Sequence, residues 1–399
     1  MKTQDYIKME DEFGAHNYHP LDVVVRDAKG VWVYDVEGKK YLDCLAAYSA
    51  VNQGHCNPKI MEVFVEQAKH VTLTSRAFRN EKLPLLYKKL HDMTGYEMFM
   101  PMNSGAEAVE SAIKLARRWG YTVKKVEADK AEIIVATGNF HGRTSTIVGF
   151  SDDPSSYKDF GPYCKEAFPM HEYGNLEDLK SKITKNTVGI LVEPIQGEGG
   201  VVIPPDGYLK GIETLCKENN ILFMCDEIQA GLGRSGKLFA HYYENVKPDM
   251  VIIGKALSGG FYPVSGVLTS KEVMLTIKPG EHGSTFGGNP LAAAVAVKAL
   301  EVIEEDKLVE KSYEMGKYFV EKLNAIKSPH IKLARARGLW IGFVLDTKAR
   351  PYCEKLMEEG ILCKETHENI IRFAPPLVIT KEEIDWAIEK ITKVVKELD

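Results

Sequence analysis

The sequence lacks the features that mark membrane, secreted and nucleic-acid-binding proteins. No apolar run is long enough to cross a bilayer. The polar, partly acidic N-terminus has neither a signal-peptide core nor the Arg/Ser-rich, acid-poor character of an organelle transit peptide. The formal net charge is only -5, with no block of like charges, which argues against nucleic acid or anionic lipid as a partner. We therefore expect a cytoplasmic protein with no membrane and no nucleic-acid partner.

The sequence also lacks cysteine and histidine patterns that would indicate crosslinks or a metal site. Its 7 cysteines are scattered, odd in number and without C-x-x-C, and its 11 histidines contain no H-x-x-x-H pair. Reduced thiols are expected, with neither a disulfide framework nor a zinc site. The remaining composition is that of an ordinary globular protein, and 399 residues suffice for about two domains.

Residues 221–260 carry the strongest chemical signal. The apolar run Ile221–Cys225 predicts a buried strand that ends at Asp226, and a second run, 251–253, is followed two residues later by Lys255. Ligands of open α/β sheets bind outside the carboxyl ends of the strands. A lysine that can form a Schiff base, with an aspartate for a pyridinium nitrogen, suits pyridoxal phosphate (PLP). The alternative is a solvated strand end and a surface lysine.

A glycine pattern in the same stretch points to a different cofactor but fits it poorly. Gly231, Gly233 and Gly236 match G-x-G-x-x-G. A dinucleotide fingerprint follows its strand directly and opens a helix. Here four residues separate Asp226 from Gly231, and the following segment is a weak helix, so a nicotinamide cofactor is not favoured.

Polar residues follow further predicted strands at 97–103, 132–137 and 188–192. Ser104 and Glu107 fit a capping box that starts a helix running to about Trp119, whose free N–H groups could hold a phosphate. A capped helix without a ligand is the plain alternative. Alternating strands and helices over residues 95–270 predict an α/β fold with a mostly parallel sheet. The polar residues at these strand ends are Asn103 to Gly105, Asn139 to Arg143, and Glu193 to Glu198.

The chain divides into three expected parts. Residues 1–50 form an N-terminal segment that packs with the small domain and contains a hairpin turning at Glu37-Gly38. Residues 51–288 form the large cofactor-binding domain. Residues 289–399 form a smaller C-terminal α/β domain, whose last helix begins with a capping box at Thr380 and Glu383.

Seven motifs together give the chain a family resemblance: AYSAVNQGH, TLTSRAF, NFHGRT, VEPIQGE, DEIQ, GKALSGG and KPGEHGSTFGGNP. On these motifs the chain resembles the class III (ω-amino acid) aminotransferases of PLP-dependent fold type I, over nearly its whole length. The resemblance implies a large domain with a mostly parallel sheet flanked by helices, and a smaller C-terminal domain. It also implies PLP as the cofactor and no metal.

The resemblance assigns cofactor roles to matching positions. It implies that Lys255 is the Schiff-base lysine and that Asp226 pairs with the pyridine nitrogen. Gln229 would reach the ring hydroxyl, while Phe140 and Ile228 would sandwich the ring. Gly105 and Ala106 would give N–H groups to the phosphate, and Ser104, Ser284 and Thr285 would also bind the cofactor. Thr285 would reach the phosphate of the other subunit, which implies a homodimer, or a higher oligomer, with shared sites.

The resemblance also implies the substrates. Tyr18, Tyr48 and Arg143 match a substrate pocket, and Glu198 with Arg372 matches a pair that manages two unlike substrates. The expected reaction transfers the δ-amino group of ornithine to 2-oxoglutarate, giving glutamate and glutamate-5-semialdehyde, which cyclises to pyrroline-5-carboxylate. Another ω-aminotransferase, using acetylornithine or 4-aminobutyrate, is the near alternative. A non-enzymatic binding protein on the same fold is the distant one.

Two positions depart from the family pattern. His141 stands where some relatives have tryptophan, and Gly199 stands where alanine is more common. We expect neither departure to touch a charge that the chemistry needs.

Overall fold

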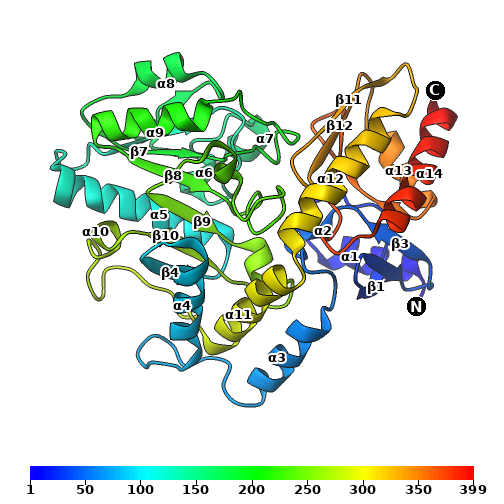
Figure 1. Ribbon diagram of the computed structural model, residues 1–399, viewed down its shortest axis with the longest axis horizontal. Coiled ribbons are helices and arrows are strands. Elements are labelled where there is room, and N and C mark those ends of the chain that lie inside the picture. The colour runs from blue at the N-terminus through cyan, green and yellow to red at the C-terminus, as the bar shows by residue number, and fades with distance from the viewer.

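The computed structural model describes residues 1–399 and is built on a seven-stranded sheet (Figure 1). In spatial order its strands are β4 (Met98–Met102), β10 (Ser265–Thr269), β9 (Met250–Ile253), β8 (Leu222–Asp226), β7 (Thr187–Val192), β5 (Glu132–Ala136) and β6 (Met170–His171). The pairings from β9 to β6 are parallel, and β10 pairs antiparallel with β9 and β4. The predicted α/β fold with a mostly parallel sheet is confirmed.

The central strands are apolar because both faces of the sheet are covered. Successive side chains of a strand point to opposite faces. Ile133 and Val135 accordingly pack in the cluster that contains helix α5 (Gly105–Trp119), whereas Ile134 and Ala136 pack in the cluster that contains α9 (Tyr208–Asn219). The continuous apolar runs of the sequence therefore correspond to strands buried on two sides.

The remaining helices of the large sheet region lie around these layers. They are α3 (Pro58–Ala68), α4 (Lys82–Thr94), α6 (Ser145–Val148), α7 (Pro154–Tyr157), α8 (Leu176–Lys182), α10 (Lys271–Met274) and α11 (Pro290–Glu305). The long apolar helix α11 packs against α3 and α4 and contributes eleven buried residues, which makes it a central support of the core. None of the helices is both long and apolar enough to cross a membrane.

The C-terminal part forms a second α/β layer. Its four-stranded sheet has the order β11 (Ile331–Ala336), β12 (Ile341–Leu345), β15 (Ile370–Phe373) and β14 (Lys364–Thr366). Its helices are α12 (Leu308–Asn324), α13 (Arg350–Glu358) and α14 (Lys381–Leu398). The capping box predicted at Thr380 and Glu383 is confirmed, since each residue binds the other's backbone N–H.

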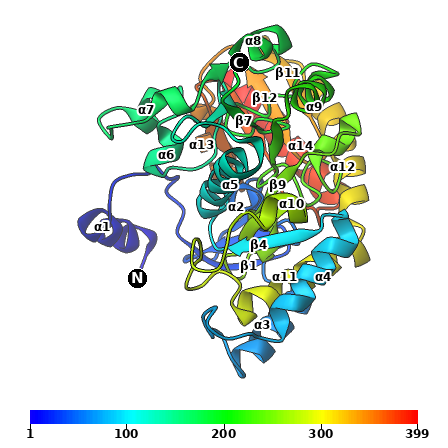
Figure 2. The ribbon, with the colours of Figure 1, turned by 90° about the vertical axis from the view of Figure 1, so that its left-hand side faces the viewer.

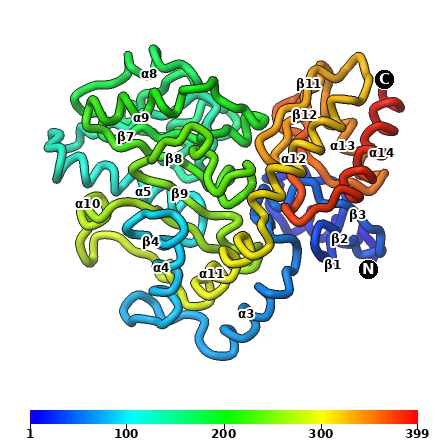
Figure 3. The backbone as a smooth tube through the Cα atoms, in the orientation of Figure 1, coloured from blue at the N-terminus to red at the C-terminus, as the bar shows by residue number.

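The N-terminal strands lie against this C-terminal part, as Figure 3 shows by the contact of blue and orange-red segments. The predicted hairpin is confirmed: β1 (Val25–Lys29), β2 (Trp32–Asp35) and β3 (Lys40–Asp43) form a sheet that β13 (Ile361–Leu362) joins through parallel pairing with β3. Helix α1 (Thr3–Phe13) stands apart from the body and buries no residue (Figure 2). The domain limits at residues 50 and 288 stay a prediction.

The glycine-rich turn at 231–236 links these parts and is not a nucleotide loop. A Cβ on Gly236 would lie 3.1 Å from the Tyr313 Cα and 3.2 Å from the Gly338 Cα, so only glycine allows this close approach. Within the turn, the buried Arg234 donates to the carbonyl oxygens of Leu339 (2.8 Å) and Pro375 (2.7 Å). The glycines therefore serve packing against the C-terminal part of the chain.

Candidate active site

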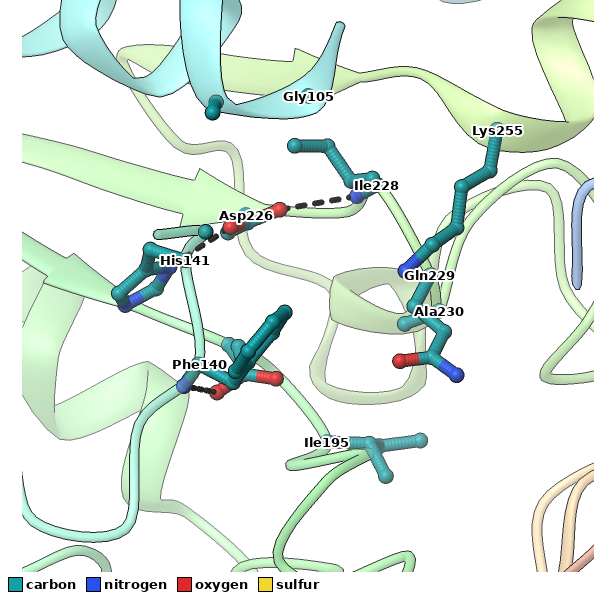
Figure 4. Close-up of a pocket in the computed structure, with 12 residues that line it drawn as sticks. Gly105, Phe140, His141, Ile195, Asp226, Ile228, Gln229, Ala230 and Lys255 are labelled. Atoms are coloured by element: carbon teal, nitrogen blue, oxygen red, sulfur yellow. Dashed lines mark hydrogen bonds and ion pairs between the residues drawn. The ribbon is translucent and has the colours of Figure 1, made fainter. Parts of the chain in front are cut away.

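A pocket of about 200 Å³ lies at the carboxyl ends of the parallel strands (Figure 4). It is lined by Gly105, Ala106, Phe140, His141, Gly142, Glu193, Ile195, Asp226, Ile228, Gln229, Ala230 and Lys255. These residues follow β4, β5, β7, β8 and β9, so the predicted convergence of polar strand ends is observed. Seven of the predicted cofactor residues lie in this one pocket.

Asp226 and Lys255 reach the pocket from neighbouring strands. Asp226 ends β8 opposite Ile252 of β9, and Lys255 begins the short turn after β9. Figure 4 shows the two side chains approaching from opposite sides. Burial lowers the pKa of Lys255, and the nearby carboxylates, led by Glu198 and Asp226, oppose this shift. An amine with a lowered pKa loses a proton more readily, which suits a group that must act as a base.

The N-terminus of α5 forms another wall. The predicted capping box is confirmed: Ser104 Oγ accepts from the Glu107 N–H at 3.3 Å, and the Glu107 carboxylate accepts from the Ser104 N–H at 2.7 Å. The first helical N–H to reach a backbone carbonyl in α5 is that of Ala108. The N–H groups of Gly105 and Ala106 are therefore free to bind an anion, such as a phosphate.

The other walls suit a flat aromatic ring with a polar edge. Ile228 and Phe140 lie on opposite sides of the space into which Lys255 points (Figure 4). Gln229 lines the same space, and its buried Nε2 has no hydrogen-bond partner. Buried polar atoms are almost always paired, so this amide is a donor that awaits a ligand acceptor. The residues present therefore fit PLP.

His141 and Gly199, the two departures from the family pattern, were expected not to touch a charge that the chemistry needs. This expectation is wrong for His141, which contacts Asp226. Its Nδ1 lies 2.7 Å from Asp226 Oδ2, and its side chain is fully buried. The expectation failed because sequence adjacency to Phe140 does not reveal which strand end the next side chain faces. Gly199 behaves as expected, since a Cβ there would make only ordinary contacts of 3.4 Å, with Gln196 and Val202.

Glu193 is a further buried acid of this pocket. Its carboxylate accepts from the Phe140 N–H at 3.0 Å, which ties the segment after β7 to the segment after β5. Burial raises the pKa of Glu193 to about 7, with Asp226 adding to the rise and His141 opposing it. The sequence placed Glu193 at this rim but gave it no role.

A second cluster lies beside the pocket and centres on an ion pair. Arg372 of β15 donates from Nη1 to Glu198 Oε1 at 2.8 Å, and its guanidinium is 1% exposed. Burial raises the pKa of Glu198, but the charge and hydrogen bond of Arg372 outweigh burial and leave the pKa below its usual value. The Tyr48 ring lies 4.9 Å from the guanidinium carbon. The predicted pairing of Glu198 with Arg372 is therefore present in the structure.

Arg143 is the accessible cation of the same region. Its guanidinium lies over the rings of Phe140 (5.5 Å) and Tyr18 (5.9 Å), and Nη1 is 3.5 Å from the Tyr18 hydroxyl. No carboxylate of the chain pairs with it. Tyr18 and Tyr48 also border a mainly apolar cavity of about 440 Å³ between the N-terminal segment and β13. Arg143 is thus free to bind a substrate carboxylate.

Tyr48 is held by an unusual backbone. Four successive residues, Ala46 to Ser49, have positive φ angles of 50°, 47°, 56° and 74°. Left-handed backbone is unfavourable for residues with a Cβ, and such strain often marks functional sites. The motif AYSAVNQGH gave no indication of this turn, because none of the four residues is glycine.

Three of the predicted cofactor residues, Ser104, Ser284 and Thr285, do not line the pocket. Ser284 accepts a hydrogen bond from Asn103 Nδ2 at 2.9 Å and lines a different cavity, and the neighbouring Thr285 does not line the pocket either. A role for Thr285 across a dimer stays a prediction. The 7 cysteines are unpaired, and no group of three or more His, Cys, Asp or Glu side chains could hold a metal ion.

Comparison with known proteins decides the family. A family model described as Aminotransferase class-III matches residues 13–395. The chain belongs to this family. Class III aminotransferases are PLP-dependent, in agreement with the fit of the pocket to this cofactor.

Several family members are similar over their full length. The ornithine aminotransferase of Geobacillus sp. (strain WCH70) is 57% identical over 393 residues, covering 98% of both chains. That of Bacillus subtilis (strain 168) is 53% identical, covering 99% of this chain and 98% of the relative. The ornithine aminotransferase structure from Toxoplasma gondii ME49 superposes with a TM-score of 0.98 at 40% identity, covering 100% and 96%. An acetylornithine aminotransferase structure from Elizabethkingia anophelis superposes with a TM-score of 0.91 at 45% identity, covering 100% of both chains.

Proposed function

We propose that this aminotransferase transfers the δ-amino group of ornithine to 2-oxoglutarate, releasing glutamate and glutamate-5-semialdehyde. The semialdehyde is expected to cyclise to pyrroline-5-carboxylate. The observation that carries the proposal is the unequal state of two arginines: Arg372 is buried and paired with Glu198, whereas Arg143 has no carboxylate partner. The full-length similarity to ornithine aminotransferases supports the same choice of substrate.

Each of these pocket residues has a separate role toward the cofactor. PLP, when bound, acts as an electron sink that acidifies the substrate carbon bearing the amine. Asp226 would hold the proton on the ring nitrogen, Gln229 would donate to the ring hydroxyl, and Phe140 and Ile228 would fix the plane of the ring. Lys255 would anchor the cofactor, and its amine would serve as the base and acid that moves the substrate proton.

The two arginines let one site accept two differently shaped substrates. With Arg372 neutralised by Glu198, Arg143 takes the ornithine carboxylate, so the distal δ-amine reaches Lys255. When 2-oxoglutarate enters, Arg372 leaves Glu198 and binds the α-carboxylate beside the carbonyl group, while Arg143 binds the far carboxylate. Charge-assisted pairing of guanidinium with carboxylate is directional and strong, which makes this exchange selective.

The tyrosines favour free ornithine over acetylornithine. Tyr18 lies beside Arg143, and Tyr48 beside Arg372, so both rings would border the region that receives the α-amino and carboxylate groups. An acetyl group there would need extra room. Steric differences of this size shift specificity by about 1–3 kcal/mol, so acetylornithine and 4-aminobutyrate remain the substrates against which ornithine must be measured.

The proposal extends to assembly and location. A homodimer, or a higher oligomer, would bring Ser284 and Thr285 of one subunit to the cofactor phosphate of the other. Ser104, Gly105 and Ala106 would supply the remaining phosphate contacts. The protein would act in the cytoplasm, in the conversion of ornithine toward proline or in arginine metabolism.

A donor panel tests the proposed function. Ornithine, acetylornithine, 4-aminobutyrate and lysine are each offered with 2-oxoglutarate, and glutamate and pyrroline-5-carboxylate are measured. We expect the highest kcat/KM with ornithine and pyrroline-5-carboxylate as its product. A higher kcat/KM with acetylornithine would assign the enzyme to that substrate instead.

A further inference from the structure

His141 lies behind Asp226, on the side away from Lys255 (Figure 4). The aspartate is clamped by two donors: His141 Nδ1 at 2.7 Å on Oδ2, and the Ile228 N–H at 3.0 Å on Oδ1. The imidazole is fully buried and the aspartate side chain is 5% exposed. An ionised carboxylate only accepts hydrogen bonds, so Nδ1 carries the proton.

The charged groups that act on His141 favour its protonated form. They are Asp226 at the end of β8 and Glu193 in the segment after β7. Burial alone lowers the pKa of His141, but the hydrogen bond and charge of Asp226 outweigh burial and raise it above its ordinary value. On the other side of Asp226, the Lys255 amine interacts with the same carboxylate. Asp226 therefore lies between a buried imidazole, whose protonated form is favoured, and the Lys255 amine.

The loop does not need the imidazole for its shape. Asn139 Nδ2 donates to the carbonyl oxygens of Ala136 (2.7 Å) and Phe150 (3.1 Å), and the Phe140 N–H binds Glu193. The second nitrogen of His141, Nε2, is buried without a partner. An apolar ring would fill this space without a buried, unpaired Nε2, so packing alone does not explain a histidine here.

We propose that His141 is a positioning residue, which holds the Asp226 carboxylate aimed at the ring nitrogen of PLP. This proposal rests on the proposed function only for the assignment of Asp226 to the ring nitrogen. A charge-assisted hydrogen bond from behind holds one carboxylate oxygen and so fixes the second oxygen on the pocket side. His141 acts in both half-reactions, because both substrates depend on the same electron sink.

Two substitutions separate charge from hydrogen bonding. His141→Gln keeps an N–H donor without the charge, and His141→Phe removes both. His171→Gln is the matched control, because His171 is equally buried but binds the Val135 carbonyl and the Tyr208 hydroxyl in the opposite cluster of the sheet. Each holoenzyme is titrated with pH while the absorbance of bound PLP is followed, and kcat and KM are measured with ornithine.

Removing one buried positive charge should make protons in the pocket harder to remove. We expect the absorbance midpoint to rise by about one pH unit in both His141 variants and to stay unchanged in His171→Gln. We expect kcat to fall about 100-fold in His141→Phe and about tenfold in His141→Gln, with KM for ornithine within about twofold of the parent. The smaller fall in kcat in His141→Gln than in His141→Phe would measure the contribution of the retained hydrogen bond.

Unchanged midpoints and unchanged kcat in both His141 variants would overturn the proposal and leave His141 as a packing residue. If His141→Phe fails to fold, the titration midpoint of His141→Gln decides alone. The titration needs no substrate, so its outcome is independent of whether ornithine is the donor. Failure of the donor panel with a shifted midpoint would refute the proposed function and keep the role of His141.

Discussion

Replacing Glu198 by alanine tests whether Arg372 is switched between the two half-reactions. The substitution leaves a guanidinium that is 1% exposed, with only the Gly197 carbonyl, 3.4 Å from Nη1, as its remaining hydrogen-bond acceptor. Removing one partner of a fully buried pair costs about 3–5 kcal/mol. Glu198 is 34% exposed, so solvent screening reduces this to about 2–3 kcal/mol. A substrate α-carboxylate can recover this energy by binding Arg372.

The predicted change is therefore a reversal of donor preference. The half-reaction with glutamate should become faster and the half-reaction with ornithine slower. The ratio of the two rates should move about 30- to 150-fold toward glutamate. The assay is single-turnover conversion of bound PLP to its amine form, followed by absorbance with each donor. Glu359→Ala is the control, because it removes a carboxylate from an ion pair with Lys393, away from the pocket. A ratio that stays constant, or moves toward ornithine, would refute the switch and leave Glu198 as a structural carboxylate.

Three further substitutions, and one control, test the role of Lys255, the backbone strain at Ala47 and the buried acid Glu193. Lys255→Ala should abolish turnover and the absorbance of covalently bound PLP without lowering Tm; normal turnover would refute the assignment. Ala47→Gly should stabilise the protein by about 0.5–1 kcal/mol in denaturant unfolding, because glycine relieves left-handed strain that exceeds its own entropy cost. Ala50 has right-handed backbone, so Ala50→Gly should destabilise the protein by a similar amount. Equal stability changes in Ala47→Gly and Ala50→Gly would contradict the strain at Ala47. The pKa of Glu193 is about 7 in the folded protein and 4.5 as its ordinary value. Proton binding by Glu193 therefore favours the folded state at low pH, and this contribution to stability is lost as the pH rises from about 4.5 through 7. Glu193→Gln should gain up to about 3 kcal/mol relative to the parent between pH 5 and 8, and a constant difference over that range would contradict the shift.

The fold and the pocket could largely be predicted because local patterns agreed with the global arrangement. The apolar runs before Asp226 and Lys255 are strands buried on two faces, and parallel strands bring their carboxyl ends to one edge. The capping box at Ser104 fixed the start of α5 without any long-range information. These features depend on spacing along the chain, which a sequence displays directly.

Contacts between distant segments could not be predicted in the same way. The bond from His141 to Asp226 joins residues 85 positions apart, and its importance depends on burial that spacing does not encode. The left-handed turn at Ala46–Ser49 is imposed by tertiary packing against the preferences of its residues. The family motifs identified Glu198 and Arg372 as partners, but only the structure gives their unequal exposure.

The regiochemistry of transamination tests the central claim most directly. Ornithine labelled with ¹⁵N at the δ-amine, or separately at the α-amine, is incubated with the holoenzyme and 2-oxoglutarate, and the label in glutamate is measured. The account predicts that glutamate acquires label from the δ-position and none from the α-position, with one pyrroline-5-carboxylate formed for each glutamate. Label arriving from the α-amine would contradict the placement of the ornithine carboxylate on Arg143.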